Sequence, residues 1–328
     1  MELYPHIMPS LSEVERLMES ALLSEDPRIY GMLPPFIKRG GKRIRPAMCL
    51  LSCGAVGGKA QSALETAAII ELFHNFTLIH DDIEDGAQFR RGEPAVHVSC
   101  GMPVALNSGD ALYTLLWKRL VTMDLEPKRL LRLQGMCAEA FKRVVDGQGV
   151  EISWIQDGRF DVSESDYLGM IDGKTSALMG LSCEAGAYLG DAKPGTCKPL
   201  RDYGEMLGAA FQIHDDVLNL TGDFSKYQKE IGGDISEGKR TLMVVHCLEN
   251  APEAERNELK SILSSHTQEK RKIQKAISIL EKHGSIDFAR ERASSLIADA
   301  RSSLSGLPSS EDRTALERIA AYAVAREK

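Results

Sequence analysis

Two acidic segments of the sequence share a local pattern that could bind metal and phosphate. The tetrapeptide Ile-His-Asp-Asp occupies positions 79–82 and returns at 213–216, each time after a long apolar stretch. On a helix, residues four apart share a face, so Asp81 and Asp85 project together. Carboxylates stacked at the carboxyl end of a helix repel each other and oppose its dipole. One such segment alone would favour a solvated surface, but two matched segments predict carboxylates that share divalent cations with substrate phosphates.

Positive groups that could bind phosphate are clustered as well. The segment GGKRIRP at 40–46 joins two glycines to three cations and then opens a predicted helix with proline. Backbone amides and guanidinium groups in this combination suit a phosphate group. The segment lacks the GxxxxGK[ST] spacing of a P-loop and follows no predicted strand, which argues against a nucleoside triphosphatase. Further candidates are FRRG at 89–92, DGKT at 172–175, Lys229 and EGKRT at 237–241.

Composition excludes several classes of protein. Of the 328 residues, 43% are apolar, 27% charged and 6% aromatic, unlike disordered, collagen-like or disulfide-rich chains. The net charge of −7 argues against a nucleic-acid partner, which needs clustered positive charge. We expect no integral membrane segment, and the acidic amino terminus lacks the features of a secretory signal. These observations, and seven scattered cysteines that suit reduced thiols, predict a cytoplasmic protein.

The spacing of apolar residues predicts an all-α fold. Between 130 and 145 they recur three and four positions apart, which is the helical period, and 128–193 contains no proline. Sustained alternation typical of strands is absent. No repeat or Ser/Gly/Pro-rich linker divides the chain, so we predict one domain spanning 1–328. The predicted helices are 11–24, 45–55, 60–82, 103–123, 127–154, 164–189, 200–220, 240–250, 251–263, 267–282, 285–304 and 309–326.

Read in order, these motifs resemble the trans-isoprenyl diphosphate synthases, the family of the farnesyl and geranylgeranyl diphosphate synthases. The resemblance covers nearly the whole chain, and eight ordered motifs make a chance match improbable. It implies a polyprenyl synthetase domain with the isoprenoid synthase fold, in which long helices surround a central substrate cavity, and a homodimeric assembly. The motifs are GGKRIRP (40–46), ELFHNFTLIHDDIED (71–85), RRGEPAVH (90–97), NSGDALY (107–113), GQGVE (147–151), GKTSAL (173–178), GAAFQIHDDVLN (208–219) and KEIGGDISEGKRTL (229–242).

The resemblance also implies a reaction, the Mg²⁺-dependent head-to-tail condensation of isopentenyl diphosphate with an allylic diphosphate of C5 to C15. By that similarity Asp81 and Asp85 would hold two Mg²⁺ ions and Asp215 a third, all bridging to the allylic diphosphate. Metals and neighbouring cations would stabilise the leaving diphosphate, so that the C–O bond ionises. The implied cations are Arg90, Lys174, Lys229 and Lys239.

The remaining implied roles concern the carbocation and the second substrate. Thr175 and Gln212 would present oxygen dipoles to the allylic cation, which the double bond of isopentenyl diphosphate attacks. Proton loss to the departing diphosphate would complete the elimination. His80 and His214 would act only indirectly. The residues implied to bind isopentenyl diphosphate are Gly41, Lys42, Arg45, His74 and Arg91.

The product length is implied by the residues just before the first acidic motif. On spacing alone Phe76 would be core packing, but in this family a bulky side chain one turn below the motif forms part of the cavity floor. Phe76 followed by the smaller Thr77, with no insertion between 81 and 85, resembles archaeal-type geranylgeranyl diphosphate synthases. We therefore expect a C20 product, with farnesyl (C15) or C25 diphosphate as alternatives.

Two other functions remain as alternatives, and one residue departs from the family pattern. A class I terpene cyclase shares the first acidic motif but ionises one substrate only, and the retained Asp215 and Asp216 argue against it. A noncatalytic partner subunit of another synthase would tend to lose an acidic motif, and this chain keeps both. Asn219 stands where the family usually has aspartate, from which we expect altered Mg²⁺ affinity or product release rather than inactivity.

Overall fold

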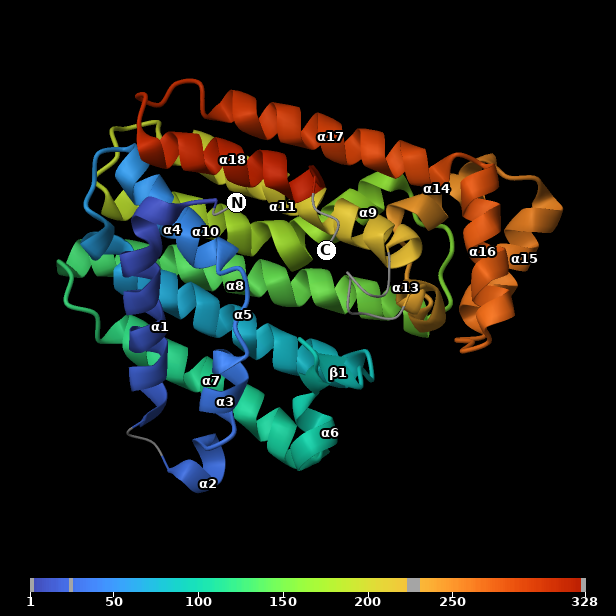
Figure 1. The fold of residues 1–328 in the computed structure, drawn as a ribbon, viewed down its shortest axis with the longest axis horizontal. Coiled ribbons are helices and arrows are strands. Elements are labelled where there is room, and N and C mark those ends of the chain that lie inside the picture. Colours follow the sequence, from blue (N-terminus) through green and yellow to red (C-terminus); the bar gives the residue numbers. More distant parts are fainter. Residues whose placement is uncertain (1–2, 24–25, 223–230, 326–328) are drawn as a thin grey trace. The chain divides into compact units, whose positions relative to one another are not determined.

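The computed structural model describes residues 3–23, 26–222 and 231–325, and these are almost entirely helical (Figure 1). The predicted all-α fold is confirmed. The α-helices are α1 (Met8–Leu23), α2 (Pro27–Tyr30), α3 (Leu33–Lys38), α4 (Ile44–Ala55), α5 (Leu64–Glu84), α6 (Val96–Cys100), α7 (Met102–Val121), α8 (Pro127–Gln156), α9 (Glu164–Ile171), α10 (Ala177–Leu189), α11 (Cys197–Thr221), α13 (Gly233–Glu237), α14 (Leu242–Asn250), α15 (Glu253–Ser264), α16 (Lys270–Lys282), α17 (Ser285–Ser303) and α18 (Glu311–Ala325). Short turns are η1 (Pro5–Ile7), η2 (Ala60–Ala63) and η3 (Asp172–Ser176).

The chain forms two compact units. The first unit comprises Met1–Phe141, Gly180–Arg201 and Gly306–Ile319. The second unit comprises Lys142–Met179, Asp202–Ser305 and Ala320–Lys328. The expectation of one domain over 1–328 stays a prediction.

Helix α5 is the central element of the first unit. It packs against α1, α4 and α7 (Figure 1). Ile69, Ile70, Leu72 and Phe73 are all fully buried, and a helix that buries consecutive residues has neighbours around its whole circumference. The helix ends after Glu84, and the chain then turns. The apolar run before the first acidic motif therefore places that motif at the end of a rigid, buried helix.

A small hairpin follows α5 and was not expected from the sequence, in which no strand was predicted. Strands β1 (Phe89–Arg90) and β2 (Glu93–Pro94) pair antiparallel. The two residues between them, Arg91 and Gly92, both have positive φ, at 56° and 78°. That is the turn geometry whose twist matches a two-residue hairpin. Strands this short carry no detectable alternation, so their sequence offers no period to read.

Helices α9 and α14–α17 build much of the second unit, in which α14 contacts α9, α16 and α17, and α15 contacts α16. Helix α9 begins with a capping box. The Asp166 amide donates to Ser163 Oγ (3.1 Å), and the Ser163 amide donates to Asp166 Oδ2 (2.9 Å). The predicted helix over 164–189 matches a continuously helical segment, in which the π-helical turn η3 interrupts the α-helical hydrogen bonding between α9 and α10. Such turns insert an extra residue and occur frequently at functional sites.

A search of the described residues for membrane-spanning segments found no helix both long and apolar enough to cross a bilayer.

Candidate active site

In the first unit the GGKRIRP segment forms a tight loop at 40–43, and its last three residues begin α4. Gly41 has φ of 141°, and a Cβ added there would lie 3.0 Å from Arg91 Nη2, so glycine allows Arg91 to approach the loop backbone. Arg43 also has positive φ, at 48°, and its buried guanidinium donates to Glu71 Oε1 (3.0 Å) and to Glu15 Oε1 (2.9 Å). Arg43 thus anchors the loop, while Lys42 is exposed.

Arg45 and His74 meet behind this loop, both half-buried. Arg45 Nη1 lies 3.2 Å from His74 Nε2, and because guanidinium can only donate, His74 accepts with Nε2 unprotonated. Burial, followed by the charges of Arg45 and Arg91, lowers the pKa of His74 well below its ordinary value. His74 is therefore neutral among several arginines, Arg45 and Arg91 included.

The first acidic motif lies at the end of α5. The Asp85 amide donates to the Asp81 carbonyl (2.8 Å), so the helical turn persists and both side chains share one face. The intervening Asp82 is fully buried and accepts a bond from Arg90 Nε (2.7 Å). Burial raises the pKa of Asp82, and the bond from Arg90 opposes that shift. Asp82 thereby positions the Arg90 guanidinium beside the two half-buried carboxylates, which both attract it electrostatically.

Phe76 belongs to a closed ring of aromatic contacts in the first unit. Its ring centroid lies 5.4 Å from that of Phe73 and 5.0 Å from that of Tyr113. Phe73 stacks on Phe141 at 3.8 Å, and Trp117 joins Phe141 (5.9 Å) to Tyr113 (6.4 Å). Thr77, next to Phe76, donates its hydroxyl to the His74 carbonyl (2.8 Å). The rings around Phe76 thus come from α5, α7 and α8, and the sequence pattern singled out only Phe76 among the five. That Phe76 forms part of a cavity floor stays a prediction.

In the second unit, Thr175 and Gln212 are joined by a hydrogen bond. Thr175 Oγ1 donates to Gln212 Oε1 (2.8 Å), and Gln212 Nε2 donates to Asp216 Oδ1 (2.8 Å). Tyr167 donates its hydroxyl to the other carboxylate oxygen, Asp216 Oδ2 (2.8 Å). Burial raises the pKa of Asp216 to about 7, against the lowering effect of bonds from Gln212 and Tyr167. Burial and the charge of Asp216 raise the pKa of Tyr167 well above its ordinary value, so the phenol stays protonated.

Lys174 and Lys239 each have a carboxylate partner in the second unit. Lys174 Nζ donates to the buried Glu151, and Lys239 Nζ contacts Glu237 and Asp234, the latter at 3.7 Å. Burial acts to raise the pKa of Glu151, but the charges of Lys174 and Lys239 lower it overall. Glu151 is the last residue of the GQGVE motif. The first residue of the same motif, Gly147, has no room for a side chain, because a Cβ there would lie 2.2 Å from the Lys174 amide nitrogen.

The second acidic motif ends differently from the first. Asp215 is half-buried on α11. Asn219 is buried, its Oδ1 accepts from the Asp234 amide (3.1 Å), and its carbonyl accepts from the Gly232 amide (2.8 Å). The side-chain oxygen of Asn219 is therefore used to hold the start of α13. An aspartate oxygen could accept the same bond, so this contact shows what position 219 does in the fold without explaining the change from aspartate.

The predicted site residues divide between the two units. The first unit holds Gly41, Lys42, Arg45, His74, Phe76, Thr77, Asp81, Asp85, Arg90 and Arg91. The second holds Lys174, Thr175, Gln212, Asp215 and Lys239. Lys229 lies outside the described residues. Sequence analysis missed the supporting residues Arg43, Glu71, Asp82, Glu151, Tyr167 and Asp216; an ionisable side chain inside a predicted buried helix, as at Glu71, was the available signal.

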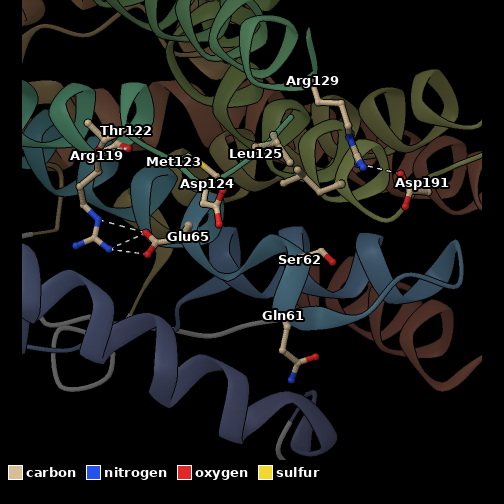
Figure 2. Close-up of a pocket in the computed structure, with 11 residues that line it drawn as sticks. Gln61, Ser62, Glu65, Arg119, Thr122, Met123, Asp124, Leu125, Arg129 and Asp191 are labelled. Carbon is tan, nitrogen blue, oxygen red and sulfur yellow. Dashed lines mark hydrogen bonds and ion pairs between the residues drawn. The ribbon is translucent and has the colours of Figure 1, made fainter. Parts of the chain in front are cut away.

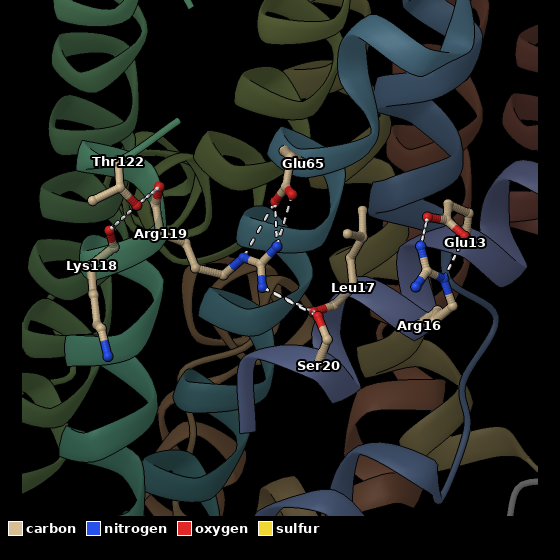
Figure 3. A network of polar contacts seen from close by, with 8 residues as sticks. All are labelled: Glu13, Arg16, Leu17, Ser20, Glu65, Lys118, Arg119 and Thr122. Carbon is tan, nitrogen blue, oxygen red and sulfur yellow. Dashed lines mark hydrogen bonds and ion pairs between the residues drawn. The ribbon is translucent and has the colours of Figure 1, made fainter. Parts of the chain in front are cut away.

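A cavity of about 560 Å³ lies elsewhere in the first unit and contains none of these residues. Figure 2 shows its charged lining, in which Arg119 pairs with Glu65 and Arg129 pairs with Asp191. Arg119 Nη1 also donates to the Leu17 carbonyl at 3.2 Å, which ties α7 to α1 (Figure 3). The paired cations of this cavity suit structural bracing rather than diphosphate binding.

Comparison with known proteins decides the family. A profile described as polyprenyl synthetase matches residues 26–280. The chain belongs to the polyprenyl synthetase family. It is 40% identical over 291 residues to a short chain isoprenyl diphosphate synthase of Methanothermobacter thermautotrophicus, covering 89% of this chain and 88% of that protein. It is 34% identical to a geranylgeranyl diphosphate synthase of Methanosarcina mazei, covering 100% and 99%.

Solved structures of the polyprenyl synthetase family agree with the fold. The crystal structure of a geranylgeranyl pyrophosphate synthetase from Pyrococcus horikoshii superposes with a TM-score of 0.92 at 35% identity, covering 99% of this chain and 98% of that one. The protein is thus a prenyltransferase, a short-chain trans-prenyl diphosphate synthase. Its family uses isopentenyl and allylic diphosphates and binds diphosphate through divalent metal.

The carboxylates of this prenyltransferase fit such a metal when it is shared with substrate. Among the described residues, no three His, Cys, Asp or Glu side chains are grouped to hold a metal ion by themselves. Mg²⁺ commonly binds one or two carboxylates and completes its shell with substrate phosphates and water. Asp81 and Asp85, on one face at the end of α5, supply such a pair of oxygen donors. These donors suit a metal that arrives with the diphosphate.

Proposed function

We propose that this prenyltransferase is a Mg²⁺-dependent geranylgeranyl diphosphate synthase. It would extend allylic diphosphates of C5 to C15 with isopentenyl diphosphate by ionisation, condensation and elimination. The observation that carries the proposal is the order of side chains along α5, where Phe76 lies one turn before Asp81 and Asp85. Support for the C20 product comes from the relatives named as geranylgeranyl diphosphate synthases.

Asp81 and Asp85 would hold up to two Mg²⁺ ions, and Asp215 a third. When bound, Mg²⁺ stabilises the charge that develops on the leaving diphosphate. Arg90, held in place by buried Asp82, adds a fixed positive charge near Asp81. Preorganised charges of this kind cost no reorganisation during ionisation.

Lys174 and Lys239 would bind the same diphosphate, together with Lys229. Glu151 supports this role because it keeps the Lys174 ammonium in one place through a charge-assisted bond. Asp234 and Glu237 act in the same way on Lys239. Thr175 and Gln212 would face the allylic cation with their oxygen atoms.

Isopentenyl diphosphate would bind to the cationic loop of the first unit. Lys42, Arg45 and Arg91 supply its positive charge, and Gly41 lets Arg91 come close to the loop. Neutral His74 fixes Arg45 by accepting its hydrogen bond, and its Nδ1–H is then a donor for the same diphosphate. Guanidinium groups bind phosphate in two-point geometry, which orients the substrate.

We further propose a homodimer, supported by four exposed apolar side chains in α6 and the start of α7. Val98, Met102, Val104 and Leu106 are each 44–48% exposed, and neighbouring exposed apolar side chains mark interaction surfaces. Light scattering should give twice the 36.0 kDa of one chain. A monomer at micromolar concentration would contradict this proposal.

The seven cysteines are all free thiols, which supports the proposed cytoplasmic location.

Product analysis tests the proposed function. Purified protein is incubated with labelled isopentenyl diphosphate and C5, C10 or C15 allylic diphosphate, with Mg²⁺ or with a chelator, and the product length is read by chromatography. We expect geranylgeranyl diphosphate only when Mg²⁺ is present. A C15 or C25 product would show that the proposed C20 product length is wrong. Cyclised hydrocarbon from a single allylic substrate would indicate a terpene cyclase, and no elongation with any primer would indicate a noncatalytic subunit.

A further inference from the structure

Four side chains of the second unit form an unbranched chain of hydrogen bonds. It runs from Tyr167 on α9 through Asp216 and Gln212 on α11 to Thr175 in the π-helical turn η3. Each link is 2.8 Å long. Tyr167 is 1% exposed, Thr175 6% and Asp216 7%. Gln212 is half-buried, so the Tyr167–Asp216 bond is the most shielded of the three links, and each proton position follows from the partners inside the chain.

The types of these groups allow one direction for the bonds. Both carboxyl oxygens of Asp216 act as acceptors, Oδ2 from the Tyr167 hydroxyl and Oδ1 from Gln212 Nε2, which places the amide nitrogen of Gln212 on the Asp216 side. The Gln212 oxygen then faces Thr175, whose hydroxyl must donate to it. Because the Thr175 proton is held by Gln212, the lone pairs of the Thr175 oxygen point away from this bond. Tyr167, by donating to the second oxygen of Asp216, fixes the carboxylate itself.

We propose that Asp216 and Tyr167 are positioning residues that keep the oxygen ends of Gln212 and Thr175 available to the allylic cation. This inference rests on the proposed function, in which Thr175 and Gln212 stabilise that cation. If the Gln212 amide turned over, its N–H group would point at Thr175, and the threonine proton would be released toward the substrate. Positive dipole ends would then face a developing positive charge. Asp216 prevents this by accepting from Gln212, although it touches no reacting atom.

Asp216→Asn tests the direction of the bonds. The introduced asparagine can present either end to Gln212, but buried Tyr167 remains a donor and needs an acceptor. Tyr167 therefore draws the asparagine oxygen to its own side, which leaves the asparagine N–H₂ facing Gln212 and turns the glutamine over. We expect the rate of allylic ionisation in a single turnover to fall about 10²-fold, similar to the loss of one preorganised dipole in other enzymes. The KM for isopentenyl diphosphate should not change.

The exchange variant Asp216→Asn with Gln212→Glu separates polarity from other roles. It keeps the net charge and moves the carboxylate to position 212. The introduced glutamate can only accept, so the introduced asparagine donates to it, Tyr167 still donates to position 216, and Thr175 still donates to position 212. We expect the exchange variant to recover at least about tenfold of the rate lost in Asp216→Asn, since a correctly oriented dipole contributes on that scale.

The control is Glu205→Gln, which makes the same carboxyl-to-amide change on α11. Glu205 pairs with Arg143 Nη1 (2.7 Å) and is not part of the chain of hydrogen bonds. Its rate should stay within about twofold of wild type, because a partly exposed pair contributes little. All variants are compared at saturating Mg²⁺.

The outcomes distinguish this inference from the proposed function. An exchange variant as slow as Asp216→Asn, or a Mg²⁺ requirement that rises in both, would overturn the positioning role and indicate a metal role for Asp216. An Asp216→Asn rate equal to wild type would also overturn it. Failure of the wild-type chain to elongate any primer would contradict the proposed function instead.

Discussion

Arg45 Nη1 lies 3.2 Å from His74 Nε2, an arrangement in which the histidine accepts and must be neutral. This pair joins the first turn of α4 to the middle of α5. Because His74 is neutral, it can lie among the arginines of the first unit without adding to the repulsion between their positive charges.

The first prediction concerns pH. The pKa of His74 in the folded protein lies well below its ordinary value because of burial and neighbouring arginines. The unfolded chain therefore binds a proton at this position near pH 6.5 while the folded chain does not, and stability falls as the pH drops below that value. Urea unfolding at pH 7 and pH 5 should show a loss that is smaller in His74→Gln, by up to about 1.4 kcal/mol per pH unit. An identical loss in both proteins would contradict a depressed pKa.

The second prediction concerns product length. Phe76→Ala opens space between α5 and α7 next to Tyr113, so the product should lengthen beyond C20, as read by chromatography. The remaining rings of Tyr113 and Trp117 should limit the gain to one or two isoprene units. The control is Phe288→Ala, which removes a ring stacked on His246 in the second unit (4.2 Å). It should leave product length unchanged. An unaltered C20 product from Phe76→Ala would show that Phe76 does not limit the product length.

The third prediction separates catalysis from stability at the end of α5. Asp81→Ala should lower kcat by about 10³-fold or more, because a group that stabilises the departing charge is lost. Its thermal stability should be equal to wild type or higher by about 0.5 kcal/mol, since a carboxylate opposing the helix dipole is removed. Exposed Glu84 offers the control, and Glu84→Ala should keep kcat within about threefold because surface charges interact weakly. Retained turnover in Asp81→Ala would remove Asp81 from the mechanism.

The fourth prediction concerns Asn219. Asn219→Asp keeps an acceptor for the Asp234 amide and adds a negative charge to the second acidic motif. The Mg²⁺ concentration for half-maximal activity should therefore decrease, as measured by metal titration. Asn219→Ala removes the acceptor of the half-buried Asp234 N–H, which should cost about 1 kcal/mol of stability. A metal requirement that is the same in wild type and Asn219→Asp would indicate that Asn219 serves the fold alone.

Much of the fold could be predicted because apolar spacing is a local signal. Helices α5, α7, α8 and α11 follow from their period, and the capping box of Ser163 and Asp166 marks the start of α9. The π-helical turn at Asp172–Ser176 carries no such signal, since its extra residue depends on the packing around it. The β1–β2 hairpin was missed because two residues are too few to show a period.

The residue types that do chemistry were determined by the sequence itself: two acidic motifs, a glycine-rich cationic loop and a Lys-Thr pair are visible without any structure. Tertiary structure alone decided how these groups are held. Arg43 and Glu71 are 28 residues apart, and Tyr167 and Asp216 are 49 apart. Partners so distant in sequence meet only when helices pack. Burial then sets their proton positions and pKa values, because a group withdrawn from water depends on its few remaining neighbours.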